Sequence, residues 1–107
     1  MKQGQEIHAK ICIQGLLIKD VIVGNALIDM YGKCGVVTEA HEVFDMLLER
    51  DTISWNALII GYAEQNHTTE VLKLFSRMPS EGILPDSVTY ITILRVFGDF
   101  AINCVQE

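Results

Sequence analysis

The stretch NALIDMY at residues 25–31 decides the fold, because it returns 31 positions later as NALIIGY at residues 56–62. The same offset pairs Phe44 with Phe75, and a weaker third copy begins at residues 85–90. Self-similarity with a period of about 20 to 50 residues is typical of proteins built from stacked structural units. The chain is therefore predicted to be a repeat protein.

Each unit of this repeat carries apolar residues at the spacing of two successive helices. Positions i, i+3, i+4 and i+7 share one face of an α-helix. The sets are Leu27, Met30, Tyr31 and Cys34; Ala40, Val43, Phe44 and Leu47; Trp55, Leu58, Ile59 and Tyr62; and Val71, Leu74, Phe75 and Met78. We assign the aromatic members to helix packing rather than base stacking, and Cys34 to a buried position rather than a nucleophile. The fold class is predicted to be all-α, an α-solenoid of helix-turn-helix units.

Residues that end and start helices fall between these apolar sets. Gly35 and Gly82 can take the left-handed conformation that closes a helix, and Pro85 stands where no helix needs to continue. Ser54 and Thr68 are predicted to be N-caps, because a hydroxyl can accept a bond from a free N–H group at a helix start.

Composition excludes several classes of protein. A chain of 107 residues with 50% apolar and 21% charged residues is too hydrophobic for intrinsic disorder. No apolar run approaches the ~18 to 20 residues that span a bilayer, so no membrane role is predicted. Three widely spaced cysteines suit neither a disulfide framework nor a zinc knuckle, and the first residues lack the pattern of an organelle transit peptide. The net charge of −6 opposes binding to a polyanion.

Three strings, VGNALIDMYGKCG at 23–35, SWNALIIGYAEQ at 54–65 and EGILPD at 81–86, resemble the plant-specific branch of the pentatricopeptide-repeat family, in which motifs of three lengths alternate. The resemblance implies a single array of pentatricopeptide repeats over residues 1–107. Its parts are a partial long-type repeat at 1–20, a short-type repeat at 21–51, a standard repeat at 52–86 and a partial long-type repeat at 87–107.

In this family the fifth residue of a motif and its last residue together read one RNA base. The resemblance therefore implies that Asn25 with Asp51, and Asn56 with Asp86, each recognise a base, and this Asn–Asp combination is the one associated with uracil. An amide can bond the Watson–Crick edge of a base while a carboxylate orients the amide. Ile91 stands where a third Asn would be, so no base is read there. The apolar residues expected to clamp the base faces are Ile22, Ile53 and Val88.

The function that the resemblance implies is sequence-specific binding of single-stranded RNA with a preference for uracil. The chain would do this within a longer RNA-processing or editing factor of a mitochondrion or chloroplast, beside other such factors. Lys33 is the candidate phosphate contact. No enzymatic activity and no cofactor are expected, and no metal is assigned to His8 and Cys12, which lack a further ligand pair. His67 and Val71 replace smaller residues of the family, which predicts altered packing there.

The residues alone leave three alternatives open. Asn25 and Asn56 lie near helix starts and could bond nearby backbone as caps instead of reading a base. The chain could be a protein-interaction module, or could self-associate, through uncapped apolar ends around Ile7, Ile11 and Phe97, as helical solenoids of similar build do. It could also be a truncated copy without a function.

Overall fold

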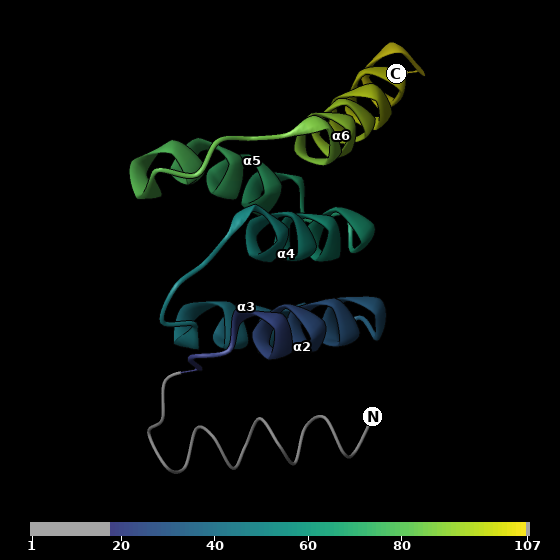
Figure 1. The fold of residues 1–107 in the computed structure, drawn as a ribbon. Coiled ribbons are helices and arrows are strands. Elements are labelled where there is room, and N and C mark those ends of the chain that lie inside the picture. The colour runs from purple at the N-terminus through teal and green to yellow at the C-terminus, as the bar shows by residue number, and fades with distance from the viewer. Residues whose placement is uncertain (1–17, 107) are drawn as a thin grey trace.

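The computed structural model describes residues 18–106, and in this range the chain is almost entirely helical (Figure 1). Within the range, the one strand-like contact is a parallel bridge between Ile18 and Leu47. The predicted helix at residues 4–14, with Ile7, His8, Ile11 and Cys12, lies outside the described residues. The helices are α2 (Val21–Lys33), α3 (Val37–Met46), α4 (Thr52–Glu64), α5 (Thr68–Arg77), the short 3-10 helix η1 (Met78–Glu81) and α6 (Ser87–Gln106).

Consecutive helices pair, and the pairs stack in layers. Figure 1 shows α2 beside α3, then α4 and α5, and then α6 near the C-terminal end. Helix α4 connects the layers, because it packs against α2, α3, α5 and α6. The predicted all-α solenoid of helix-turn-helix units is confirmed.

Aspartates start the first helix of each layer. The carboxylate of Asp20 accepts bonds from the N–H groups of Ile22 and Val23, at 3.0 and 3.3 Å, where α2 begins. At the start of α4, Asp51 accepts a bond from Ser54 N–H at 2.9 Å, and Ser54 Oγ accepts one from Asp51 N–H at 3.2 Å. This reciprocal pair is a capping box. The prediction that Ser54 is the N-cap is therefore wrong, because Ser54 is the third residue inside the helix and Asp51 is the cap.

The turn into α5 differs from the prediction in the same way. Thr68 is the first residue of α5, and His67 holds the N-cap position without a side-chain bond, so the predicted Thr68 cap is wrong. The ring of His67 instead lies 5.7 Å from the ring of Tyr62. The predicted left-handed glycines are confirmed, with φ of 79° at Gly35 and 76° at Gly82.

The core lies between the layers and is built on aromatic residues. Tyr31, Phe44 and Trp55 are fully buried and Tyr62 is nearly so, which confirms their assignment to helix packing. The rings of Phe44 and Trp55 meet edge to face, with centroids 4.8 Å apart. Such a pair contributes about 0.5 to 1.5 kcal/mol beyond the burial of its area. Trp55 therefore ties α4 to α3 across two layers.

Of the positions predicted to be buried on the packed faces, one is exposed and two are only partly buried. Cys34 is exposed. It is the C-cap of α2, one residue beyond the helix, so helical spacing no longer sets where its side chain points. Met30 and Phe75 are only partly buried at the edge of the core.

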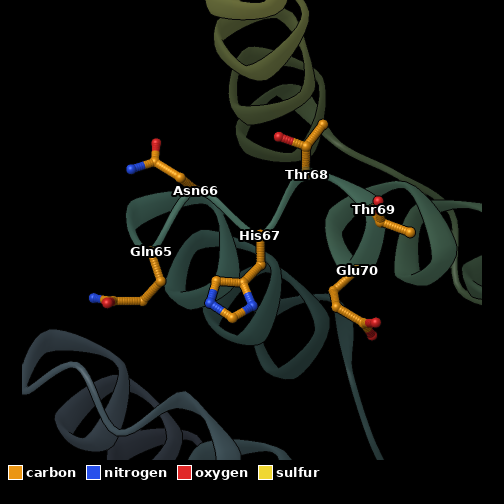
Figure 2. A pocket seen from close by; sticks show the side chains of 6 residues that line it. All are labelled: Gln65, Asn66, His67, Thr68, Thr69 and Glu70. Carbon is orange, nitrogen blue, oxygen red and sulfur yellow. The ribbon is translucent and has the colours of Figure 1, made fainter.

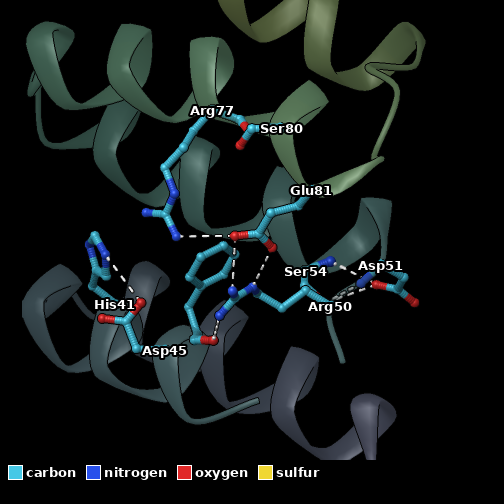
Figure 3. Close-up of polar contacts among 9 residues, drawn as sticks. His41, Asp45, Arg50, Asp51, Ser54, Arg77, Ser80 and Glu81 are labelled. Atoms are coloured by element: carbon cyan, nitrogen blue, oxygen red, sulfur yellow. Dashed lines mark hydrogen bonds and ion pairs between the residues drawn. The ribbon is translucent and has the colours of Figure 1, made fainter. Parts of the chain in front are cut away.

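Arg50, in the loop before α4, joins two layers (Figure 3). Its guanidinium donates to both carboxylate oxygens of Glu81, at 3.1 and 3.0 Å, and to the carbonyl of Phe44 at 2.9 Å. Arg77 donates to the same carboxylate at 3.3 Å and lies 5.3 Å from the ring centre of Trp55. Bidentate, charge-assisted bonds of this kind fix orientation as well as distance. They hold the loop before α4 against η1.

Two glycines let α2 and α4 approach each other. A Cβ on Gly32 would lie 3.4 Å from Gly61 Cα, and a Cβ on Gly61 would lie 3.5 Å from Gly32 Cα. A side chain longer than a methyl group at either position would meet backbone of the other helix. This contact sets the spacing between the first helices of neighbouring layers.

Candidate nucleic-acid interface

Asn25, Asp51 and Ser54 form one connected polar group between α2 and α4. Asn25 Nδ2 donates to Asp51 Oδ1 at 3.1 Å, and Ser54 Oγ donates to Asn25 Oδ1 at 2.5 Å. Asp51 is also the cap of α4. One set of hydrogen bonds therefore starts a helix of the second layer and fixes an amide of the first.

The same arrangement recurs between α4 and α6. Asn56 Nδ2 donates to Asp86 Oδ1 at 2.9 Å, and Thr89 Oγ1 donates to Asn56 Oδ1 at 2.5 Å. Thr89 N–H donates to Asp86 Oδ1, and Asp86 N–H donates to Thr89 Oγ1, both at 3.1 Å. The structure thus brings together both pairs that the family resemblance implies. The capping alternative for the two asparagines does not hold, because Asp20 and Asp51 cap α2 and α4.

Both carboxylates of these groups are held in the charged form. Partial burial raises the pKa of Asp51, but bonds from the Ser54 N–H, the Asn25 amide and the Ser54 hydroxyl bring it below its usual value. For Asp86, the bond from the Asn56 amide lowers the pKa most, and the Thr89 N–H adds to it. A charged carboxylate only accepts hydrogen bonds. Each amide must therefore turn its Nδ2 towards its aspartate.

Each amide keeps part of its bonding capacity. A primary amide has two N–H donors and a carbonyl oxygen with two lone pairs. One N–H is used by the aspartate and one lone pair by the hydroxyl. One N–H and one lone pair therefore remain on each of Asn25 and Asn56. They suit a planar ligand that presents an acceptor next to a donor, as the edges of nucleobases do.

Both asparagines border one hollow of about 450 Å³. Ile53 and Val88, two of the predicted clamps, line it and are 64% and 44% exposed. The third predicted clamp, Ile22, is exposed at the start of α2 and is not among the lining residues. The lining residues are Asn25, Ala26, Asp29, Ile53, Asn56, Ala57, Ile60, Asp86 and Val88. The hollow thus combines polar groups that can bond a base edge with apolar groups that can cover a base face.

Lys33, the predicted phosphate contact, is not among the residues that line this hollow. Its ammonium lies 2.9 Å from a carboxylate oxygen of Asp29, one turn earlier on α2. The hydrogen bond and charge of Asp29 raise the pKa of Lys33, and the charge of Glu64 adds to this. Glu64 lies with Lys33 around a small neighbouring pocket. The charge of Lys33 is therefore opposed by carboxylates from α2 and α4.

A second open hollow, of about 430 Å³, surrounds the turn between α4 and α5 (Figure 2). Its lining consists of the turn and the first residues of α5, from Gln65 to Glu70. No cluster of His, Cys, Asp and Glu within the described part of the chain could hold a metal ion. None of the helices in residues 18–106 is both long and apolar enough to cross a membrane. We assign no chemistry to this second hollow.

Ser54 and Thr89 complete the two polar groups, although sequence reasoning does not assign them to the site. Each follows its aspartate by three residues, in the spacing Asp-x-x-Ser/Thr. That spacing is a signal of a capping box. It identifies the cap, but not the bond that each hydroxyl makes to the asparagine of the preceding layer.

Stacked helix pairs that repeat one polar group at equivalent positions define a helical-repeat protein of the solenoid class. Comparison with protein families gives two matches: a PPR repeat family at residues 50–99 and a PPR repeat at residues 25–52. The chain belongs to the pentatricopeptide-repeat family.

Similar proteins are found in Arabidopsis thaliana, and all three described here are named pentatricopeptide repeat-containing proteins. One is 42% identical over 100 residues, covering 89% of this chain and 14% of the relative. A second, named as chloroplastic, is 43% identical over 104 residues, covering 97% and 17%. A third, named as mitochondrial, is 44% identical over 92 residues, covering 86% and 10%. The chain therefore spans only a small part of the length of the relatives it matches.

Proposed function

We propose that this chain binds single-stranded RNA and reads two adjacent bases, one with Asn25 and Asp51 and the next with Asn56 and Asp86. The observation that carries the proposal is that the same three-residue polar group occurs twice, on the first helices of neighbouring layers. A linear ligand with a repeating chemical unit matches a repeating site. Ile53 and Val88 supply the apolar surface against which bases pack.

Uracil is the proposed preference at both positions. Its edge presents an N–H between two carbonyl oxygens, so it can bond the free donor and the free acceptor of one amide. The repeat boundaries 1–20, 21–51, 52–86 and 87–107, with alternating long, short and standard motifs, belong to the same proposal. So does the role of the whole protein in organellar RNA processing or editing. The chloroplastic and mitochondrial names of two relatives support the organelle.

The expected affinity of this chain alone is low. Two bases that stack and bond at about 1 to 3 kcal/mol each give only a few kcal/mol. That energy corresponds to a dissociation constant on the order of a millimolar. The net charge of −6 weakens binding further at low salt.

A titration of the ¹⁵N-labelled chain with U-rich and A-rich single-stranded RNA tests the proposal. At low salt we expect shifts of the Asn25 and Asn56 side-chain amide signals, and a stronger response to the U-rich RNA. If neither RNA moves these signals at millimolar concentration, the proposal is wrong. Equal responses to both RNAs would contradict the uracil preference and support only RNA binding.

Changing Glu64 tests the path of the RNA backbone. Glu64 occupies the place of Lys33 in the next unit, 31 residues later, and faces the same small pocket. We expect Glu64→Lys to raise RNA affinity roughly fivefold at low salt and to steepen the salt dependence by about 0.7 in the logarithmic slope, because it adds a phosphate contact. Fluorescence anisotropy over a salt series measures both.

The control for Glu64→Lys is Glu42→Lys, which makes the same charge change on an exposed position of α3. Glu42 lines neither pocket of the proposed interface. An equal gain from both variants would mean that only net charge matters, and would contradict a phosphate path beside α4.

One observation favours a second candidate function, protein–protein association. Tyr90, Leu94 and Phe97 of α6 are 51%, 68% and 48% exposed. Their equivalents in α4, 35 residues earlier, are Trp55, Ile59 and Tyr62, which are buried. We propose self-association through this face as the alternative. Concentration-dependent mass in analytical ultracentrifugation, lost in Leu94→Glu, would support it.

A further inference from the structure

The hydroxyl groups of Ser54 and Thr89 occupy the centre of each polar group. Both residues are completely buried, so neither hydroxyl is open to water. Each Oγ accepts a bond from the backbone N–H of its aspartate, at 3.2 Å for Ser54 and 3.1 Å for Thr89. The position of each oxygen is therefore fixed by backbone.

A hydroxyl has a single proton to donate. Two acceptors lie within reach of it in each group. For Ser54 the asparagine oxygen is at 2.5 Å and the aspartate oxygen at 2.9 Å, and for Thr89 the distances are 2.5 and 3.1 Å. The shorter distance assigns the proton to the asparagine carbonyl in both groups.

This bond decides the tilt of the amide. The aspartate alone holds one end of the amide, because it binds Nδ2, and the side chain can still turn about its last torsion, which is broad for asparagine. A second bond at Oδ1 fixes the plane. The plane sets where the remaining N–H and the remaining lone pair point.

We propose that Ser54 and Thr89 are positioning residues for base recognition, which aim the amides of Asn25 and Asn56 at the base edge. The discrimination between bases in one unit then depends on a hydroxyl supplied by the next unit. This inference rests on the proposed function, and it adds a third member to each two-residue reading site.

The variant Thr89→Val tests the second site, because valine keeps the shape of threonine and lacks the hydroxyl. We expect the ratio of affinities for U-rich over A-rich RNA to fall by about three- to tenfold, as loss of one buried hydrogen bond to the amide implies. The Asn56 side-chain amide signals should shift and their hydrogen exchange should accelerate. Thr89→Ser restores the hydroxyl and should restore both the ratio and the signals.

The matched control is Thr92→Val in the same helix. Thr92 is also buried, and its hydroxyl donates to the carbonyl of Val88 at 2.9 Å, outside the polar group. It should lower the melting temperature without changing the base ratio. If Thr89→Val lowers the melting temperature and leaves the ratio and the Asn56 signals unchanged, the hydroxyl is only structural and the inference is overturned.

The first site provides an independent pair of variants, should Thr89→Val fail to fold. Ser54→Ala removes the hydroxyl and Ser54→Thr keeps it, and the Asn25 amide signals report the outcome. Failure of the proposed function looks different. In that case the unaltered chain shows no response to either RNA. If only the positioning role is wrong, Thr89→Val and Ser54→Ala still bind RNA and still prefer the U-rich RNA.

Discussion

Replacing Trp55 with alanine is expected to lower the free energy of unfolding by about 3 to 5 kcal/mol, the cost of emptying a large buried site. Trp55 is fully buried, meets the ring of Phe44 edge to face, and lies under the guanidinium of Arg77. A domain of this size has about 5 to 15 kcal/mol in total. A large share of this free energy of unfolding is lost, and urea unfolding followed by circular dichroism measures the loss.

Trp55→Phe is the matched control for this prediction. The Nε1–H of Trp55 is buried without a hydrogen-bond partner among the described residues. Phenylalanine removes that unsatisfied donor and keeps a ring, so the two effects offset each other and the loss should be below about 1.5 kcal/mol. If alanine and phenylalanine cost the same, the ring contact with Phe44 does not stabilise the layers.

The double variant Asn25→Ala, Asn56→Ala is expected to abolish the response to U-rich RNA. Each amide that bonds a base edge in two places is worth about 1 to 3 kcal/mol. Loss of both weakens a millimolar complex by at least 30-fold. The titration with U-rich RNA then shows no saturable shift.

The fold should survive this double change, because the two aspartates keep their backbone bonds to Ser54 and Thr89. Circular dichroism checks that. Gln65→Ala, which removes an exposed amide at the end of α4, serves as the control and should leave binding unchanged. Retained U-rich binding in the double variant would show that RNA is held elsewhere.

Much of the fold follows from local periodicity. Apart from Cys34, the four apolar sets mark buried or partly buried positions of the helix pairs, because helical spacing is imposed within one turn of chain and needs no knowledge of neighbours. Errors arise at helix ends. Asp51 and Ser54 are both good N-caps, and only the reciprocal bonds show which of them takes that role.

The candidate site is harder to predict from the residues alone. Asn25 lies 26 residues from Asp51, and Asn56 lies 30 residues from Asp86. Resemblance to the family pairs these residues, whereas spacing by itself does not. The bond from Thr89 to Asn56 depends on how closely two layers approach. The ion pair of Lys33 with Asp29, in contrast, follows from its i, i+4 spacing on one helix.

Asp51 and Asp86 each accept a bond from a helix N–H group and from an asparagine amide. Under the proposed function, this limits which residues can replace them when the chain is redesigned for another RNA. An engineer can exchange Asn25 or Asn56 without touching a helix start. Exchanging either aspartate for a residue that cannot cap a helix also costs about 0.5 to 2 kcal/mol. Only Asp, Asn, Ser and Thr accept bonds from helix N–H groups and still present a polar group to the amide. Under the proposed function, the last residue of each repeat is therefore restricted to about four residue types by the start of the next helix, and not by the RNA.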